Sequence, residues 1–309
     1  MMRRKKIALV VLCGPTGGGK TALAARLCEH WPLEVISADS RQVFRGMDVG
    51  TAKASRAEQA LVPHQLIDVV DPDEEFSAAD FAERGRTLIE DIVARGRRPW
   101  VVGGTGFYIR ALTQGLLDAP SGDEGLRRRW HALAREQGSS ALWERLRQVD
   151  PRAAARIHPN NVVRVVRALE VFTLTGRPIS ELQERHRFED RPYALLKLGV
   201  MPSRDELFRR IDERVDAMAN GGLFEEAQAL LARGYSPRLK SLRTLGYGEA
   251  IAYLRGEISR ERALELIKVH TRQYAKRQLT WFQKDPEIIW VDSLREFATI
   301  QQLIENFYS

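Results

Sequence analysis

The sequence predicts an α/β protein, with helices on both faces of a parallel sheet and an all-helical domain inserted into the chain. Strand-like apolar segments alternate with helix-like segments through the first third, and such alternation is typical of a parallel sheet. Strand signals are absent from 118–191, where Arg, Leu, Ala and Glu dominate, and they return at 195–200. We therefore expect a first core segment at 1–117, a helical insertion at 118–191, and a second core segment at 192–309 with basic helices.

Apolar runs of four to six residues mark the strands, and we expect strands at 7–12, 34–37, 66–70, 99–102, 195–200 and 288–291. The segment 77–95 is expected to be a helix, because Ser77 can cap it with Asp80 three residues on, and apolar side chains then share one face. Further helices are expected at 204–219, 223–233 and 259–283, and four or five in the insertion. Ligands of such a sheet bind at the carboxyl ends of its strands.

Composition and charge narrow the class of protein. The 309 residues are 44% hydrophobic and 29% charged, as in an ordinary globular protein. A formal charge of +7 and a pI of about 9.6 favour a polyanionic partner. No apolar run approaches the ~20 residues that span a bilayer, so we expect no membrane partner. The two cysteines, Cys13 and Cys28, lack metal-ligand spacing and are expected to be buried thiols in a reducing cytoplasm.

A glycine-rich loop follows the first strand and precedes a run of good helix formers. It fits the pattern G-x-x-x-x-G-K-[ST] and consists of Gly14, Pro15, Thr16, Gly17, Gly18, Gly19, Lys20 and Thr21. A strand, glycine loop and helix in this order aim backbone N–H groups and the helix dipole at one anion. Lys20 is expected to reach terminal phosphates, and the Thr21 hydroxyl to ligate Mg²⁺, directly or through water. The sequence therefore predicts a P-loop NTPase-like core that binds a diphosphate or triphosphate; the alternative is a chance glycine-rich turn.

Two more turns lie where strands of this sheet end. Asp39 follows the second strand, where a carboxylate could hold Mg²⁺ through water or act as a general base; a turn or helix cap by Asp39 or Ser40 is the alternative. The strand at 99–102 ends in glycines and not in Asp, which argues against an ATPase motor. Thr105, in the glycine-rich turn that follows, is either a ligand donor or a helix N-cap.

Basic residues recur at helical spacing in three places. Arg164 and Arg167 share one helical face, and the alternative is a solvated surface. Arginines of the 204–219 helix could reach the phosphate site, or form salt bridges on the surface. The helix that starts at 259 carries seven basic residues against Glu261 and Glu265, with aromatic residues between them. Basic and aromatic residues together suit a nucleic acid backbone with stacked bases.

These motifs keep a fixed order along the chain, at 14–21, 39–42, 103–108, 157–160, 164–170, 246–247 and 272–282. In this order they resemble the bacterial tRNA dimethylallyltransferases, also called tRNA isopentenyltransferases, over about residues 7–291. The resemblance implies transfer of a dimethylallyl group from dimethylallyl diphosphate to the exocyclic N6 amine of an adenosine. That adenosine lies 3′ to the anticodon in tRNAs that read codons beginning with U. Diphosphate leaves with the help of Mg²⁺, and the base must flip out of its stack.

The resemblance also assigns roles to residues. It implies a catalytic role for Asp39, Thr16 and Thr105, and diphosphate binding by residues 14–21 with Arg210 and Arg214. It implies contacts with the tRNA anticodon stem-loop by Asp39, Ser40, Arg41, Gln42, Thr105, Arg127, Val163, Arg164, Val165, Val166, Arg167, Gly246, Tyr247, Lys276 and Arg277. We expect the protein to act as a monomer.

Some positions depart from the family pattern. Gly17 and Gly18 stand where Ala and Ser are common, which keeps the backbone donors but removes a hydroxyl. Gly248 stands where a basic or polar residue is common, and Val162 and Val163 where Pro-Gln or similar is common. Two other readings compete with the transferase: a nucleotide or small-molecule kinase built on the same loop, and an RNA-binding regulator with an inactive site.

Overall fold

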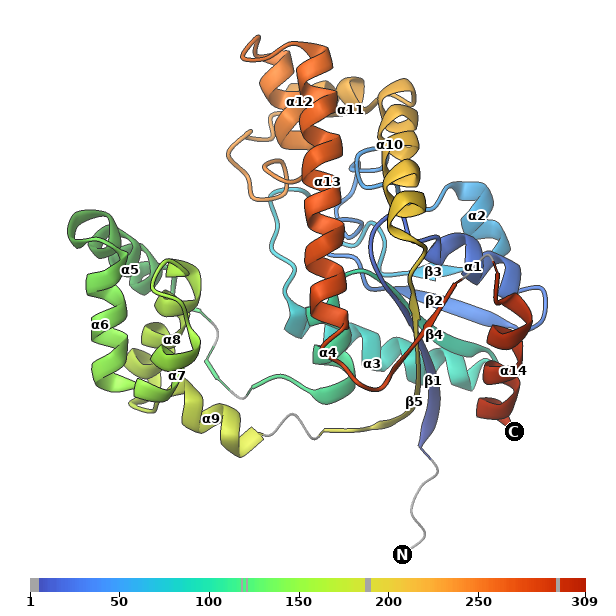
Figure 1. Ribbon diagram of the computed structural model, residues 1–309, viewed down its shortest axis with the longest axis horizontal. Coiled ribbons are helices and arrows are strands. Elements are labelled where there is room, and N and C mark those ends of the chain that lie inside the picture. Colours follow the sequence, from blue (N-terminus) through green and yellow to red (C-terminus); the bar gives the residue numbers. More distant parts are fainter. Residues whose placement is uncertain (1–5, 118, 121, 187–189, 293–294) are drawn as a thin grey trace, which may run out of the picture. The chain divides into compact units, whose positions relative to one another are not determined.

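The computed structural model describes residues 6–117, 119–120, 122–186, 190–292 and 295–309 (Figure 1). Contacts within the chain divide it into two compact units. The first combines Met1–Thr113 with Arg191–Ser309, and the second is Gln114–Asp190.

The first unit is built on a six-stranded sheet whose strands are all parallel, in the order β3-β2-β4-β1-β5-β6. The strands are β1 (Ile7–Cys13), β2 (Leu33–Ser37), β3 (His64–Gln65), β4 (Arg98–Gly103), β5 (Tyr193–Val200) and β6 (Ile288–Val291). Val11 of β1 lies opposite Val101 on one side and Lys197 on the other. The parallel sheet confirms the predicted α/β fold class.

The prediction of a strand at 66–70 is wrong. Only His64 and Gln65 pair with β2, and the chain then turns away. Leu66 and Asp68 have φ values of 63° and 56°, in the left-handed region that interrupts a strand. Apolar composition alone could not reveal this local backbone conformation.

Helices of the first unit are α1 (Lys20–Leu27), α2 (Arg56–Leu61), α3 (Ala78–Ala94), α4 (Gly106–Gln114), α10 (Arg204–Asn220), α11 (Leu223–Ala232), α12 (Tyr247–Leu254), α13 (Arg260–Phe282) and α14 (Phe297–Tyr308). The predicted cap of α3 is confirmed, since Ser77 accepts the Asp80 N–H and Asp80 accepts the Ser77 N–H at 2.8 Å. Side chains of α1 and α14 pack with β1, β4 and β5 in one apolar core, and α3 packs against β2 and β4.

A second apolar core lies among α10, α11, α12 and α13. It buries Val215, Leu223, Tyr247 and Ile267 together with residues of the 43–49 segment. Figure 1 shows α10 and α13 rising side by side beyond the carboxyl ends of the strands, and the two helices are in contact. The helices α10 to α13 therefore lie at the carboxyl ends of the strands, where ligands of parallel sheets bind.

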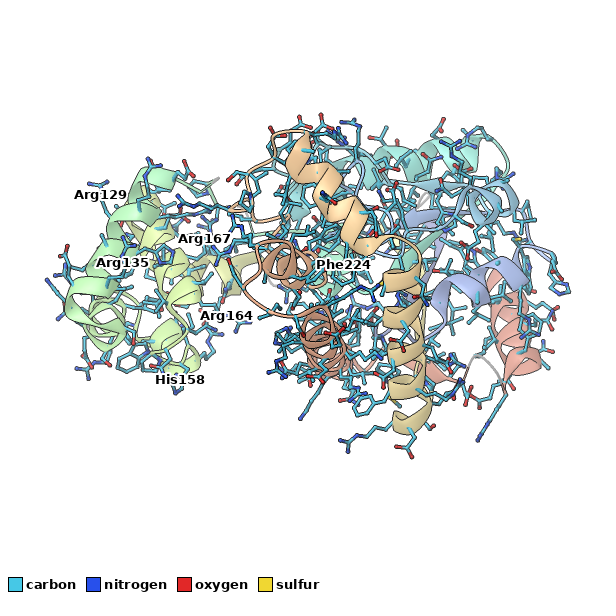
Figure 2. The ribbon with its side chains drawn as sticks, turned by 90° about the horizontal axis from the view of Figure 1, so that it is seen from above. Arg129, Arg135, His158, Arg164, Arg167 and Phe224 are labelled. Carbon is cyan, nitrogen blue, oxygen red and sulfur yellow. The ribbon has the colours of Figure 1, made fainter. Side chains whose placement is uncertain are left out.

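The second unit is helical in its described residues, with α5 (Glu124–Gln137), α6 (Ser139–Val149), α7 (Pro151–Arg156), α8 (Val162–Thr175) and α9 (Ile179–His186). Its core includes Leu142, Leu146, Val165 and Leu169. Figure 2 shows arginines projecting from α5 and α8 of this unit.

Candidate active site

The glycine-rich loop connects β1 to α1 in a conformation that needs its glycines. Gly14, Gly17 and Gly19 have φ values of 140°, 77° and 91°. A Cβ on Gly14 would lie 2.5 Å from the carbonyl oxygen of Val200, so no side chain fits there. Gly19 is the N-cap of α1, which leaves backbone N–H groups at the start of this helix for an anion.

Lys20 folds over its own loop. Its Nζ donates to the carbonyl oxygens of Gly14, at 3.0 Å, and Pro15, at 2.8 Å. Burial, and then the nearby Arg214, lower the pKa of Lys20 to about 8. Thr21 follows with an exposed side chain at the first turn of α1. The loop thus concentrates positive charge that an anion would stabilise.

Arg214 lies at the same site, whereas Arg210 does not. Arg214 lines the cavity, donates to the carbonyl oxygen of Thr51 at 3.2 Å, and has its pKa lowered by burial. Arg210 donates to Glu206 Oε1 at 2.6 Å and is not part of the cavity wall. Of the two arginines that the sequence suggested for the diphosphate, the geometry favours Arg214.

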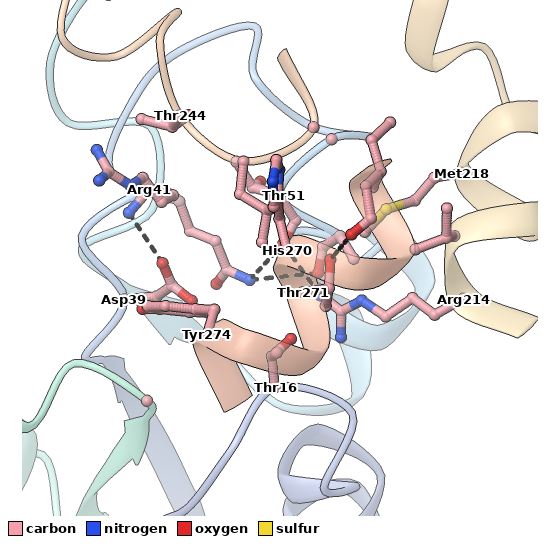
Figure 3. A pocket seen from close by; sticks show the side chains of 18 of the residues that line it. Thr16, Asp39, Arg41, Thr51, Arg214, Met218, Thr244, His270, Thr271 and Tyr274 are labelled. Carbon is pink, nitrogen blue, oxygen red and sulfur yellow. Dashed lines mark hydrogen bonds between the residues drawn. The ribbon is translucent and has the colours of Figure 1, made fainter. Parts of the chain in front are cut away.

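Asp39 follows β2 and faces the cavity (Figure 3). One carboxylate oxygen accepts the N–H of Arg41 at 2.8 Å, so the turn cap considered from the sequence is present. The carboxylate also contributes to the electrostatics of Lys20, Arg214 and Tyr274. Asp39 therefore stabilises a local turn and also lies at the phosphate site.

Thr105 joins the two turns. Its Oγ1 accepts the N–H of Ser40 at 3.0 Å, and its own N–H donates to the carbonyl oxygen of Ala38 at 3.0 Å. A Cβ on Gly103 would lie 2.2 Å from that same Ala38 oxygen. The glycine-rich turn after β4 is therefore bonded to the Asp39 turn, and Thr105 is tied to Ser40 through its hydroxyl.

One cavity of about 800 Å³ is lined by Thr16, Lys20, Asp39 and Arg214, whereas Thr105 is not part of its wall. It is lined by the phosphate loop, the ends of β2 and β4, and side chains of α10, α12 and α13 (Figure 3). Burial raises the pKa of Tyr274, beside Thr105, to about 12, so its hydroxyl stays neutral and can donate a hydrogen bond. Apolar side chains of Val215, Met218 and Ile267 line another part of the wall.

Several residues that the resemblance assigns to tRNA lie around this cavity. Arg41, Gln42, Gly246 and Arg277 line it, and Lys276 is exposed on α13. Tyr247 is fully buried, and its hydroxyl donates to Glu226 at 2.5 Å. Its ring therefore has a packing role in this structure.

The remaining candidates lie in the helical unit. Val163 is 71% exposed and Arg164 is exposed, whereas Val165 and Val166 are buried in the helical core. Arg127 and Arg167 both donate to the buried carboxylate of Glu170. The run 163–167 thus offers one face outward, because a helix turns successive residues in different directions.

Sequence reasoning missed three residues of interest. Arg129 and Arg135 are exposed on α5 of the helical unit (Figure 2), and the Arg127–Arg129 run was a signal for the first of them. Gln278 lines the cavity from α13 and is buried. A lone glutamine carries no sequence signal.

The residues at this site could hold a Mg²⁺ ion that is bound mainly by the phosphates of a substrate. No group of three His, Cys, Asp or Glu side chains suited to a metal ion occurs among the described residues. Mg²⁺ characteristically keeps several waters and uses one or two protein oxygens plus substrate phosphates. The exposed Thr21 hydroxyl beside Lys20 is such an oxygen. Across the described helices, none is long and apolar enough to cross a membrane.

The fold and this site define a phosphate-loop α/β protein whose anion cradle shares one cavity with a carboxylate and a hydroxyl. Comparison with known proteins gives the family. The sequence model of the IPP transferase family matches residues 42–285, and the chain belongs to this family. It is 53% identical to a tRNA dimethylallyltransferase of Geobacter metallireducens, over all of both chains. It is 52% identical to that of Geobacter sulfurreducens, over 98% of this chain and 97% of the relative.

Solved structures of similar proteins agree with this family assignment. A tRNA isopentenylpyrophosphate transferase of Bacillus halodurans is 41% identical with a TM-score of 0.73, and the match covers 98% of this chain and 97% of that one. A eukaryotic dimethylallyltransferase described as acting on tRNA is 29% identical with a TM-score of 0.82, over 98% of this chain and 80% of that one.

Proposed function

We propose that this protein transfers the dimethylallyl group of dimethylallyl diphosphate to the N6 amine of an adenosine in tRNA. The acceptor is the adenosine 3′-adjacent to the anticodon in tRNAs that read codons beginning with U. One observation carries the proposal: a single cavity is lined by the phosphate loop with Lys20 and by Asp39 at the neighbouring turn. Family membership and the names of the relatives support it.

The reaction exchanges one bond at the allylic carbon. The bond from N6 to C1 forms, the bond from C1 to the diphosphate oxygen breaks, and diphosphate departs with the electron pair. Backbone N–H groups of the loop, Lys20 and Arg214 stabilise the charge on the leaving group. Mg²⁺, held by the diphosphate and Thr21, would supply further charge neutralisation. The allylic cation character at C1 is delocalised, so leaving-group stabilisation is effective.

The acceptor amine needs help because an adenine amine is a weak nucleophile. Asp39 accepts a hydrogen bond from N6 and takes its proton as the new bond forms. Thr16 contacts the diphosphate through its side chain, and Thr105 aligns the substrates beside Tyr274. These roles are supported by the positions of Thr16, Asp39 and Tyr274 on the cavity wall.

The adenosine must leave the anticodon stack to reach this cavity, so we propose base flipping. Exposed Arg41 and Arg277 on the cavity wall are suited to the backbone of the anticodon loop. The exposed arginines of α5 and α8 provide further phosphate contacts. We further propose that the protein acts in the cytoplasm as a monomer, where the free thiols of Cys13 and Cys28 stay reduced.

A transfer assay tests the proposal. The protein is incubated with Mg²⁺, ATP, dimethylallyl diphosphate labelled in its prenyl group, and unmodified tRNA. The control tRNA carries guanosine at the acceptor position. Label is expected only in the adenosine tRNA, with diphosphate released in equal amount, and EDTA is expected to abolish transfer. A kinase would instead consume ATP and leave the tRNA unlabelled, and that result would overturn the proposal.

A further inference from the structure

Gln278 of α13 occupies an unusual position between two glycine-rich loops. It is 7% exposed, and both ends of its amide are bonded to backbone groups. Oε1 accepts the N–H of Thr16 in the phosphate loop at 2.8 Å, and Nε2 donates to the carbonyl oxygen of Gly104 at 2.9 Å. A single side chain therefore bridges the loop after β1 and the turn after β4.

The packing beside this bridge leaves no room for a side chain at Gly104 or Gly106. A Cβ on Gly104 would lie 2.1 Å from Gln278 Nε2, and a Cβ on Gly106 would lie 2.2 Å from the ring of Trp281. Neither glycine has a positive φ, so the reason for glycine here is the close approach of α13 and not backbone strain. The turn and the helix are thus fitted to each other over one helical turn.

The Gln278 bridge also affects which backbone N–H groups of the phosphate loop can bind an anion. The N–H of Thr16 is engaged by Gln278 and that of Gly18 donates to the carbonyl oxygen of Pro15, so an anion in the loop is bound by the remaining N–H groups and by Lys20. On the other side, the bridged turn carries Thr105, whose hydroxyl accepts the N–H of Ser40 next to Asp39. The phosphate loop is thus linked to the Asp39 turn by the hydrogen bonds of Gln278, the peptide bond between Gly104 and Thr105, and the hydrogen bond between Thr105 and Ser40.

We propose that Gln278 is a positioning residue that sets the distance between the diphosphate cradle and the proton acceptor Asp39. The proposal deepens the prenyl transfer proposed above and rests on it. An amide is required because the bridge needs one acceptor, for Thr16, and one donor, for Gly104. An ionised Glu at this position would place a second acceptor against the Gly104 carbonyl oxygen, and it would add negative charge beside the bound diphosphate.

Three variants test the bridge. Gln278→Met keeps the length of the side chain and removes both hydrogen bonds. Gln278→Glu keeps the acceptor, and when protonated it also regains the donor. Gln273→Met is the matched control, because Gln273 is exposed on the same helix. Circular dichroism and urea unfolding establish which variants are folded.

The first measurement is calorimetric binding of inorganic diphosphate with Mg²⁺, which needs no transfer activity. Gln278→Met is expected to bind diphosphate about tenfold more weakly, which is about 1.4 kcal/mol. Gln273→Met is expected to bind it as the wild type does. In transfer assays, Gln278→Met is expected to raise KM for dimethylallyl diphosphate and lower kcat, with tRNA Kd within about twofold of wild type. Equal diphosphate affinity in Gln278→Met and wild type would overturn the proposal.

The pH dependence of Gln278→Glu separates positioning from simple packing. Burial favours the protonated carboxyl, which matches the amide in shape and hydrogen bonding. Its diphosphate affinity, relative to wild type at each pH, is expected to rise at least fivefold as the pH falls from 8 to 6. A ratio that does not change with pH would contradict the bridge, even if Gln278→Met fails to fold. If wild type transfers no prenyl group while these binding differences hold, the proposed function fails and the bridge stands.

Discussion

Lys20 illustrates at the scale of one residue how burial prepares a site for its ligand. Its ammonium donates to two carbonyl oxygens of the same loop. Burial and the proximity of Arg214 lower its pKa to about 8, because both disfavour the charged ammonium. A bound diphosphate would reverse that shift, so binding and protonation of Lys20 are coupled.

This coupling predicts a pH dependence for ligand binding. Above about pH 8 the free protein loses the Lys20 proton and must regain it to bind diphosphate, so affinity is expected to fall by up to tenfold per pH unit. The ligand in this titration is dimethylallyl diphosphate, because inorganic diphosphate itself loses its last proton in this pH range and the ester does not. Calorimetric titration from pH 7 to 10 measures the effect. In Lys20→Arg the guanidinium stays charged, and a slope unchanged in this variant would refute the assignment.

Two substitutions of Asp39 separate its role in the turn from its proposed role as a proton acceptor. Asp39→Asn keeps an oxygen that can accept the Arg41 N–H but loses the proton acceptor, whereas Asp39→Ala loses both. Both variants are expected to lower kcat by roughly 10²–10⁴-fold, with tRNA Kd nearly unchanged. Single-turnover transfer and filter binding measure the two quantities. Near-normal kcat in Asp39→Asn would show that Asp39 matters only as a turn residue.

At the scale of elements, α8 shows how one helix serves both a core and a surface. Val165 and Val166 face the helical core, Arg164 faces outward, and Glu170 is a fully buried carboxylate. Glu170 accepts the backbone N–H of Asp123 and hydrogen bonds from two arginines that border the surface. The element thereby fixes where the charged ends of those arginines lie.

Removing this carboxylate is expected to destabilise the helical unit. Glu170→Ala removes the buried acceptor of the Asp123 N–H and of two partly exposed arginines, and we expect a loss of about 2 kcal/mol in the free energy of unfolding. Urea unfolding followed by tryptophan fluorescence measures it, because Trp130 and Trp143 of this unit contribute to the signal together with the four tryptophans of the first unit. Glu144→Ala is the control, because its ion pair with Arg147 is exposed and is worth under about 1 kcal/mol. Equal losses in the two variants would contradict the structural role of Glu170.

At the scale of the whole molecule, the protein carries an excess of positive charge, which we expect to attract tRNA. The formal charge of +7 is accompanied by exposed arginines on α5 and α8 and by basic residues on α13. Contacts between such residues and phosphates release counterions from the RNA, which makes affinity depend on salt. This long-range attraction does not depend on the details of the cavity.

Binding of the anticodon stem-loop is therefore expected to weaken by about 10- to 100-fold between 50 and 200 mM salt. Fluorescence anisotropy with a labelled stem-loop gives the slope of log Kd against log salt. Arg164→Ala is expected to reduce that slope by about one contact, while Arg26→Ala leaves it unchanged, because Arg26 lies over the ring of Phe297 on α14. A flat salt response would exclude the basic residues as the tRNA-binding surface.

The sequence by itself determined the α/β class, the phosphate loop, the capped helix α3 and the family, because these depend on local patterns and on the order of motifs. It misplaced the strand at 66–70, where two left-handed residues interrupt an apolar run. It could not choose between Arg210 and Arg214, since both share a helix and only packing against the loop at Thr51 separates them.

Only the tertiary structure shows which of the predicted residues are exposed and which distant residues are hydrogen-bonded at the site. It buried Tyr247, Val165 and Val166, and it brought Gln278 to Thr16, a residue 262 positions away in the chain. Hydrogen bonds and burial of this kind depend on contacts between distant segments, which leave no local pattern in the sequence. Physical proximity, created by the parallel sheet and the helices above it, turned a phosphate loop and a separate carboxylate into one cavity.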